Sequence, residues 1–113
     1  MSTIFSKIIN KEIKSNIVYE DDQILAFEDV DPQAPVHILI IPKKEIKTIN
    51  DIEVDNIEVL GKLFLVAKDI AKEKKIDKDG YRVVMNCNDY AGQTVFHIHL
   101  HLLGGRKFSW PPG

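Results

Sequence analysis

The sequence predicts an α+β domain built on one antiparallel sheet. Three runs of strand-forming residues come first, a long helical pattern follows, and two more strand-forming runs complete the order. The connections are short, which favours antiparallel neighbours over parallel strands with helical crossovers. With 113 residues, 44% hydrophobic and 28% charged, the chain has the size and composition of one globular domain. We expect a single domain over residues 1–113, with a five-stranded sheet, one long helix and one short helix.

The first elements are a short helix and a hairpin. Apolar residues at helical spacing predict an amphipathic helix over Ile4–Glu12, with Ser2 or Thr3 as its cap. Two runs rich in β-branched and aromatic residues follow, Asn16–Glu20 and Gln23–Glu28. The pair of aspartates between these runs predicts a tight turn, so the two runs form a hairpin.

The middle of the chain contains a loop, a buried strand and the long helix. Two prolines exclude helix and predict a loop over Asp31–Pro35. The almost continuous apolar run Val36–Ile41, which Pro42 ends, predicts a central strand that carries one polar residue, His37. The region Asp55–Lys74 has apolar residues at helical spacing and a cap-like start, which predicts the long helix.

Two strands complete the predicted sheet. The runs Tyr81–Asn86 and Val95–Leu103 have the composition of strands, and the polar segment Asn88–Gln93 between them predicts a loop. No internal repeat or linker-like segment interrupts this order. All five strands therefore belong to one sheet in one domain.

Composition excludes several functional classes. Fifteen Lys and Arg against seventeen Asp and Glu give a formal charge of −2, a balance that disfavours general nucleic-acid binding. No run approaches the ~18 apolar residues of a membrane span, and the polar start is unlike a secretory signal. The single cysteine, Cys87, favours a reducing compartment. We expect a cytoplasmic protein (nuclear also in a eukaryote) that binds neither nucleic acid nor membrane.

The sequence is most informative at a row of three histidines. His97, His99 and His101 alternate with aliphatic residues, so on a strand the histidines point to one face and the aliphatics to the other. Neighbouring histidines would be about 7 Å apart along the strand. The remaining histidine, His37, lies in another apolar strand. Chance and surface solvation explain such a row poorly, so it indicates a functional site.

Two kinds of chemistry fit the row. His-x-His on a strand can present two imidazoles to one metal ion, but zinc needs further ligands, and the sequence has neither a Cys pair nor a His-Glu motif nearby. Alternatively, an imidazole can act as nucleophile while its neighbours orient it and move protons. The flanking Gly92–Thr94 and Gly104-Gly105 permit close approach to a phosphoryl group. We expect no metal and no cofactor.

The segment His97–Leu103 reads His-φ-His-φ-His-φ-φ, where φ is apolar, and resembles the signature of the histidine triad (HIT) superfamily. The resemblance covers nearly the whole chain and includes Ala26–Val30, Pro32–Pro35, Pro42–Lys44, Gly92–Thr94 and Gly104–Arg106. The ending Trp110–Gly113 resembles the Hint branch, the purine nucleoside phosphoramidases. The diadenosine polyphosphate hydrolase branch lacks that ending, and the galactose-1-phosphate uridylyltransferase branch has Gln in place of His101.

The resemblance implies an activity and an assembly. The activity is hydrolysis of the P–N bond in adenosine or guanosine 5′-phosphoramidates, including AMP linked to an amine such as lysine. The assembly is a homodimer whose two sheets join into one continuous ten-stranded sheet. Two alternatives stay open: a dinucleotide polyphosphate hydrolase of the same fold, and a nucleotide-binding regulatory module whose interactions matter more than turnover.

The resemblance also implies roles for the reacting groups. His99 would be the nucleophile that attacks the α-phosphorus and becomes a nucleotidyl-histidine, and His37 would hold its imidazole in position. His101 would contact the phosphate. Thr94, where the family more often has Ser, would assist the leaving amine. His97 would support the other histidines and would not itself be a catalyst.

The remaining implied residues bind the nucleotide. Asn86 and Gln93 would contact the phosphate, Gly92 would be a further nucleotide-binding residue, and Asp29 would bind the ribose hydroxyls. The base pocket would consist of apolar side chains: Phe5, Ile8, Ile13, Phe27, Val30 and Leu39. Trp110 would reach the active site of the partner subunit.

Overall fold

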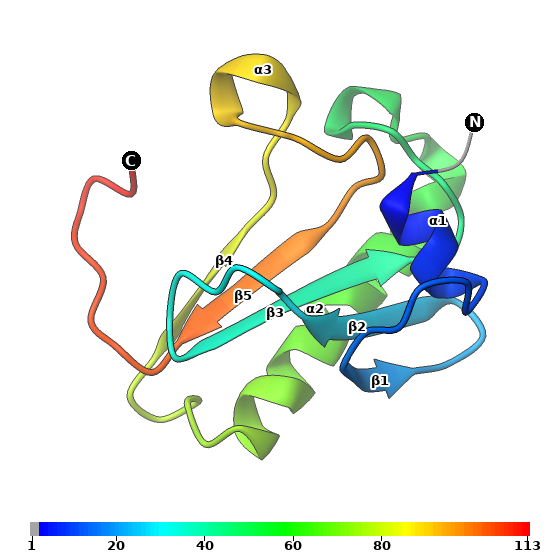
Figure 1. The fold of residues 1–113 in the computed structure, drawn as a ribbon. Helices are drawn as coiled ribbons and strands as arrows, with labels where there is room; N and C mark the ends of the chain where they lie inside the picture. The colour runs from blue at the N-terminus through cyan, green and yellow to red at the C-terminus, as the bar shows by residue number, and fades with distance from the viewer. Residues whose placement is uncertain (1–2) are drawn as a thin grey trace.

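A computed structural model describes residues 3–113 and confirms the α+β class (Figure 1). The helices and strands in chain order are α1 (Ile4–Ile9), β1 (Ile17–Glu20), β2 (Ile24–Glu28), β3 (Val36–Pro42), α2 (Ile57–Glu73), β4 (Tyr81–Val84), α3 (Asn88–Ala91) and β5 (Leu100–Gly104). Two 3₁₀ turns, η1 (Ile49–Asp51) and η2 (Val54–Asn56), precede α2. The strands form one antiparallel sheet in the order β1-β2-β3-β5-β4, so β3 and β5, which carry His37 and His101, are neighbours near its centre.

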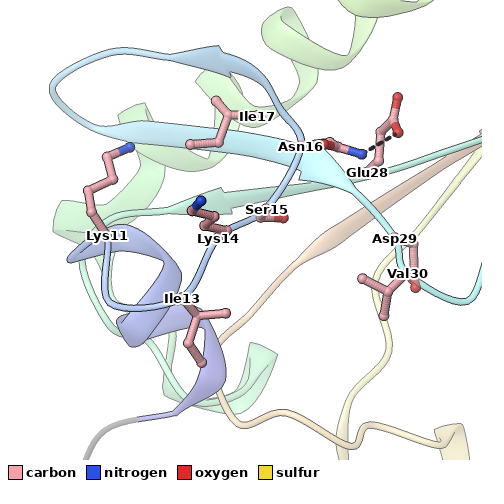
Figure 2. Close-up of a pocket in the computed structure, with 9 residues that line it drawn as sticks. All are labelled: Lys11, Ile13, Lys14, Ser15, Asn16, Ile17, Glu28, Asp29 and Val30. Atoms are coloured by element: carbon pink, nitrogen blue, oxygen red, sulfur yellow. Dashed lines mark hydrogen bonds between the residues drawn. The ribbon is translucent and has the colours of Figure 1, made fainter.

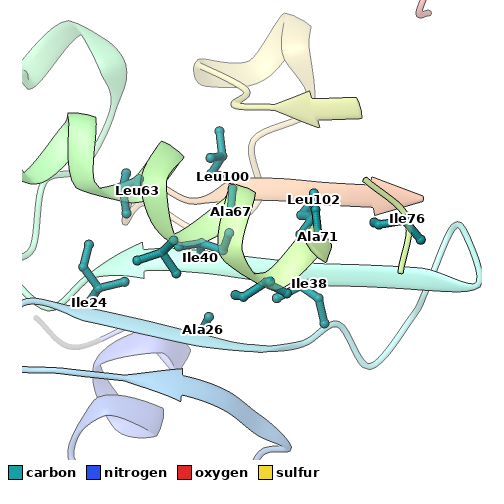
Figure 3. Packing of buried hydrophobic residues seen from close by; sticks show 12 residues of the cluster. Ile24, Ala26, Ile38, Ile40, Leu63, Ala67, Ala71, Ile76, Leu100 and Leu102 are labelled. Carbon is teal, nitrogen blue, oxygen red and sulfur yellow. The ribbon is translucent and has the colours of Figure 1, made fainter. Parts of the chain in front are cut away.

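The long helix α2 packs on one face of the sheet (Figures 1 and 3). Because side chains alternate along a strand, Ile38 and Ile40 of β3 and Leu100 and Leu102 of β5 all point to α2. They form one core with the buried helix residues Leu63, Val66, Ala67, Ile70 and Ala71. Each large aliphatic side chain buried there stabilises the fold by about 1.5–3 kcal/mol. Leu100 and Leu102, which alternate with the histidines, therefore hold β5 against the core.

The opposite face of the sheet has a smaller apolar cluster and the histidines. Phe5 and Ile8 of α1 pack there on Leu25, Phe27, Leu39 and Ile41. Thr3 caps α1 through its side-chain oxygen, as predicted, whereas Ser2 lies outside the described residues. α1 covers the β2 end of this face, and its Phe5 ring reaches the histidine row. One face of the sheet therefore forms the core with α2, and the opposite face carries the candidate site.

The prediction of a strand over Val95–Leu103 is wrong for residues 95–99, because regular pairing begins only at Leu100. The partner strand β3 ends at Pro42, which has no N–H to continue the ladder. The preceding segment is instead fixed by single bonds, including one from the Ile98 N–H to the Ile46 carbonyl at 2.7 Å. The alternation of the side chains survives without the ladder. Likewise, β4 ends at Val84, not Asn86.

The helix boundaries also differ from those predicted. The long helix begins at Ile57 because residues 54–56 form the 3₁₀ turn η2, and the short helix ends at Ile9, two residues before the positive φ of Lys11. The predicted loop after β4 contains the one-turn helix α3, which Gly92 ends with a φ of +84°. β1 and β2 form the predicted hairpin, although each strand begins one residue later than predicted. No helix of residues 3–113 combines the length and apolar character needed to cross a bilayer.

Candidate active site

His37 of β3 and His101 of β5 meet on the face of the sheet opposite α2. Nε2 of His37 lies 2.9 Å from Nδ1 of His101 and 3.4 Å from Oδ2 of Asp29. On the other side of the same ring, the backbone N–H of Gln33 donates to Nδ1 of His37 at 3.0 Å. Because an amide N–H can only donate, neutral His37 carries its proton on Nε2 and donates it to His101. Neutral His101 therefore carries its own proton on Nε2.

His99 is held in the opposite tautomer. Its Nδ1 lies 2.8 Å from the carbonyl oxygen of His97, which can only accept, so Nδ1 carries the proton and Nε2 keeps a lone pair. This Nε2 has no hydrogen-bond partner among residues 3–113 and is not sealed from solvent. The ring centroids of His99 and His101 are 5.0 Å apart. The site thus presents a lone pair and an N–H on neighbouring rings.

The pairing of His37 differs from the one implied by the family. We expected His37 to hold His99, but its hydrogen bond goes to His101. The register of the sheet explains the difference, because Leu39 is opposite His101 and His37 is therefore diagonal to it. The hydrogen bond that orients the His99 imidazole comes from the main chain, at the His97 carbonyl.

His97 supports the row from the interior. Only 1% of its surface is exposed, and its Nε2–H donates to the Pro42 carbonyl oxygen at 2.6 Å. The next residue, Ile98, donates its N–H to Ile46. These two bonds fix the peptide whose carbonyl orients His99. Nδ1 of His97 has no partner among residues 3–113.

All four histidines have a pKa below the ordinary imidazole value. Loss of hydration on burial is the largest cause in each of the rings. For His101, burial and the neighbouring His99 and His37 lower the pKa to about 4. The carboxylate of Asp29 opposes the shift in the three rings of this site. At pH 7 these imidazoles are neutral, so the His99 lone pair is not lost to protonation.

His37 and His101 line a pocket of about 320 Å³ together with Asn86, which follows β4. An amide and an imidazole N–H are both donors suited to phosphoryl oxygens. Gln33 and Arg106 also reach this pocket, and the sequence analysis assigned a role to neither. They are 73 positions apart in the chain, and no spacing rule connects them.

A larger pocket of about 530 Å³ lies between the α1–β1 connection and the end of β2 (Figure 2). Of the predicted nucleoside residues, Ile13, Asp29 and Val30 line it. Glu28 and Asn16 lie in its wall, where the Asn16 amide donates to the Glu28 carboxylate at 3.4 Å. Asp29 contacts His37 as well, so one carboxylate connects this pocket with the histidines.

The other predicted base-pocket residues lie deeper. Phe5, Ile8, Phe27 and Leu39 are buried in the smaller core cluster and do not line the open pocket. The Phe5 ring meets the His99 ring edge-on, with centroids 4.9 Å apart. These side chains form the buried floor of the site, and Phe5 packs against the His99 ring.

The loop before the row is braced by Gln93. Its amide N–H groups donate to the carbonyls of Lys47 and Val95, and its carbonyl accepts from the Asn88 N–H. The side chain is buried, so its polar groups are already satisfied within the chain. Gly92 ends α3 beside it, and the exposed Thr94 lines a separate groove next to α1 instead of the histidine pocket.

The C-terminal segment passes beside the histidine pocket. Ser109 and Pro112 line that pocket, while the Trp110 side chain is 82% exposed. The segment is held by Phe108, whose ring lies between the guanidinium groups of Arg82 and Arg106 at 5.2 and 4.3 Å. Within one chain, Trp110 has no packed position.

The chain belongs to the HIT family: the model described as "HIT domain" matches residues 10–108. Within that family it is Hint-like, since it is 56% identical over 107 residues to the purine nucleoside phosphoramidase of Escherichia coli K12 (95% of this chain, 90% of that protein). It is 55% identical over 113 residues to the 14 kDa zinc-binding protein of Zea mays (98% and 88%). The crystal structure of a HIT family hydrolase from Legionella pneumophila superposes with a TM-score of 0.97 at 52% identity (99% and 100%).

The name of the maize relative raises the question of whether the residues present could hold zinc. Ligand atoms of Asp29, His37 and His101 lie within 4.8 Å of one another. A metal on Nε2 of His37 would need the lone pair there and the proton on Nδ1. That proton would then face the N–H of Gln33, two donors in contact. The hydrogen bonding therefore suits a proton-sharing pair of histidines and does not fit a metal centre.

Proposed function

We infer that this HIT-family protein is a purine nucleoside phosphoramidase. It is a hydrolase that cleaves the P–N bond of adenosine or guanosine 5′-phosphoramidates, such as AMP linked to lysine. One observation carries this proposal: His99 presents a lone pair beside the N–H of His101. The first group suits attack on phosphorus and the second suits a phosphoryl oxygen. The activity named for the Escherichia coli relative supports the choice of the P–N bond.

The reaction proceeds in two displacements at the α-phosphorus. In the first, the Nε2 lone pair of His99 forms a bond to phosphorus and the bond to the amine breaks. The amine leaves with the bonding pair and takes a proton from water. In the second, water adds to the nucleotidyl-His99, loses a proton and releases the nucleoside monophosphate, and the bonding pair returns to Nε2. The His97 carbonyl stabilises the positive charge that His99 acquires.

The phosphate is held by neutral donors. His101 offers its Nε2–H and Asn86 its amide from the same pocket, so binding needs no cluster of lysines. Gln93, whose amide is already bonded, acts through the Gly92–Thr94 loop that it braces.

The nucleoside occupies the pocket of Figure 2. Asp29 lies between that pocket and His37, so its carboxylate accepts the ribose hydroxyls while the α-phosphate reaches the histidines. Ile13 and Val30 cover the base, above the buried floor described above.

The working form is a homodimer. Ile57, Phe64 and Leu65 of α2 are apolar yet exposed, and beside them Gly61 leaves space for a second helix. An exposed apolar face of this kind is stabilised when a second subunit covers it. β4 is an edge strand and can pair with the β4 strand of a partner, which would give ten continuous strands. In that dimer Trp110 reaches the partner's site, and the cytoplasm is where the enzyme works.

A fluorogenic adenosine phosphoramidate tests the proposal, with a diadenosine polyphosphate as the comparison. We expect release of the amine and AMP from the first substrate and much slower cleavage of the second. Preferred cleavage of the P–O–P substrate would identify a dinucleotide hydrolase instead. Tight binding of AMP with turnover of neither substrate would identify a binding module.

A further inference from the structure

The proton arrangement of His37 and His101 is fixed by a main-chain group of the loop between β2 and β3. Gln33 donates its backbone N–H to Nδ1 of His37, and this bond decides which nitrogen of His37 carries the proton. His37 in turn donates to Nδ1 of His101. The proton on Nε2 of His101 therefore depends on the position of the Gln33 main chain, which lies between Pro32 and Pro35.

That loop is held mainly by the corner that follows β5. Arg106 donates to the Gln33 carbonyl oxygen from Nε at 3.2 Å and from Nη2 at 3.0 Å. Gly105, with a φ of +89°, packs so closely that a Cβ on it would lie 2.8 Å from Cβ of Pro35. Arg106 follows the last residue of β5 by two positions, so the strand that carries the His101 ring leads directly into the corner that holds the Gln33 loop.

We propose that Arg106 is a positioning residue of the phosphoramidase reaction: by clamping Gln33, it keeps the His37–His101 pair in the tautomer that points an N–H at the phosphate. The proposal rests on the proposed function. Arg106 also lines the pocket of His37 and His101, but the hydrogen bonds that it makes go to the carbonyls of Gln33 and Lys107, so its proposed route to the reaction runs through Gln33 and His37. A guanidinium suits this task because its planar fork places two donors on one carbonyl oxygen, which an ammonium on a flexible stem does not reproduce.

Steady-state kinetics of Arg106→Lys and Arg106→Ala test the clamp. We expect kcat to fall about 10- to 100-fold, the size typical of a misplaced catalytic group, with KM changed by less than about twofold. Millimolar guanidinium should restore part of the Arg106→Ala rate. Arg106→Lys keeps the charge, so it tests the geometry even where Arg106→Ala fails to fold. Wild-type kcat in Arg106→Lys together with no guanidinium rescue would overturn the proposal.

Two control variants distinguish the hydrogen bonds from Arg106 to Gln33 from a general effect of positive charge and from a loss of order in the C-terminal segment. Lys107→Ala removes a neighbouring positive charge without touching Gln33, and its kcat should match the wild type. Phe108→Leu removes the ring that Arg106 stacks on but leaves the bonds to Gln33. If Lys107→Ala loses as much activity as Arg106→Ala, charge alone explains the effect and the clamp is wrong.

Nitrogen-15 NMR of the histidine rings reads the tautomers without turnover. Wild type and Phe108→Leu should show His101 as a single Nε2–H tautomer, and Arg106→Ala should show a mixture. A loss of kcat with an unchanged His101 tautomer would overturn the route through His37. Because this measurement needs no substrate, it distinguishes failure of the clamp from failure of the proposed phosphoramidase function.

Discussion

The Nδ1–H of His99 donates to the main-chain carbonyl of His97 at 2.8 Å, whereas Nδ1 of His101, on the neighbouring ring, accepts from His37 at 2.9 Å. Two histidines two residues apart are therefore held in opposite tautomers by different partners. The first exposes a lone pair and the second an N–H. This difference in bonding, which residue type alone does not distinguish, supports the proposed roles of His99 as nucleophile and His101 as helper.

The two histidines should respond differently to removal. His101→Ala loses a phosphate contact and should lower kcat by about 10² to 10⁴, the usual value of acid–base help. His99→Ala and His99→Asn lose the covalent route and should fall to background. Initial rates with a phosphoramidate substrate measure both effects. Calorimetric titration with AMP is the control, and binding should survive in the His99 variants.

The activity should persist on the acid side of neutrality. His99 must be neutral to attack, and burial lowers its pKa, so the protonated fraction becomes large only below the ordinary value of about 6.5. We expect kcat/KM to rise with pH and to reach its plateau below that value. A pH–rate profile checks this. A rate that increases steadily as the pH drops below about 5 would be incompatible with an imidazole nucleophile.

Catalysis should not depend on a metal ion. The Gln33 N–H forces the proton of His37 onto the nitrogen that a metal would need. Dialysis against EDTA should leave kcat and KM unchanged, and added zinc should give no activation. Activity lost to the chelator and restored by zinc would show that the hydrogen bonds around His37 have been misassigned.

The dimer should depend on the exposed apolar face of α2. Phe64→Lys puts a charge where the proposed partner helix packs, so it should give monomers at micromolar concentration. Glu73→Lys, also exposed on α2 but outside that face, is the matched control and should stay dimeric. Sedimentation velocity distinguishes the two forms. A wild-type protein that sediments only as a monomer would remove both the dimer and the role of Trp110.

Local patterns were sufficient for part of the site. The alternation in the row correctly predicted that Leu100 and Leu102 enter the core while His101 lies on the other face. The partner of His37 was predicted incorrectly because it depends on the register between β3 and β5, a contact between segments 64 positions apart. Gln93 shows the same limit. The family resemblance implied a phosphate contact for Gln93, but its amide N–H donates to the Lys47 carbonyl, 46 positions away, which no local pattern indicates.

The most direct test of the account is the location of the covalent intermediate. Rapid-quench mass spectrometry during turnover of an adenosine phosphoramidate should find a nucleotidyl adduct on the wild-type protein. Peptide mapping with fragmentation should place the adduct on His99, and His99→Ala should show none. An adduct on His97, His101 or Thr94, or turnover that never forms one, would contradict the assignment of His99 as the nucleophile.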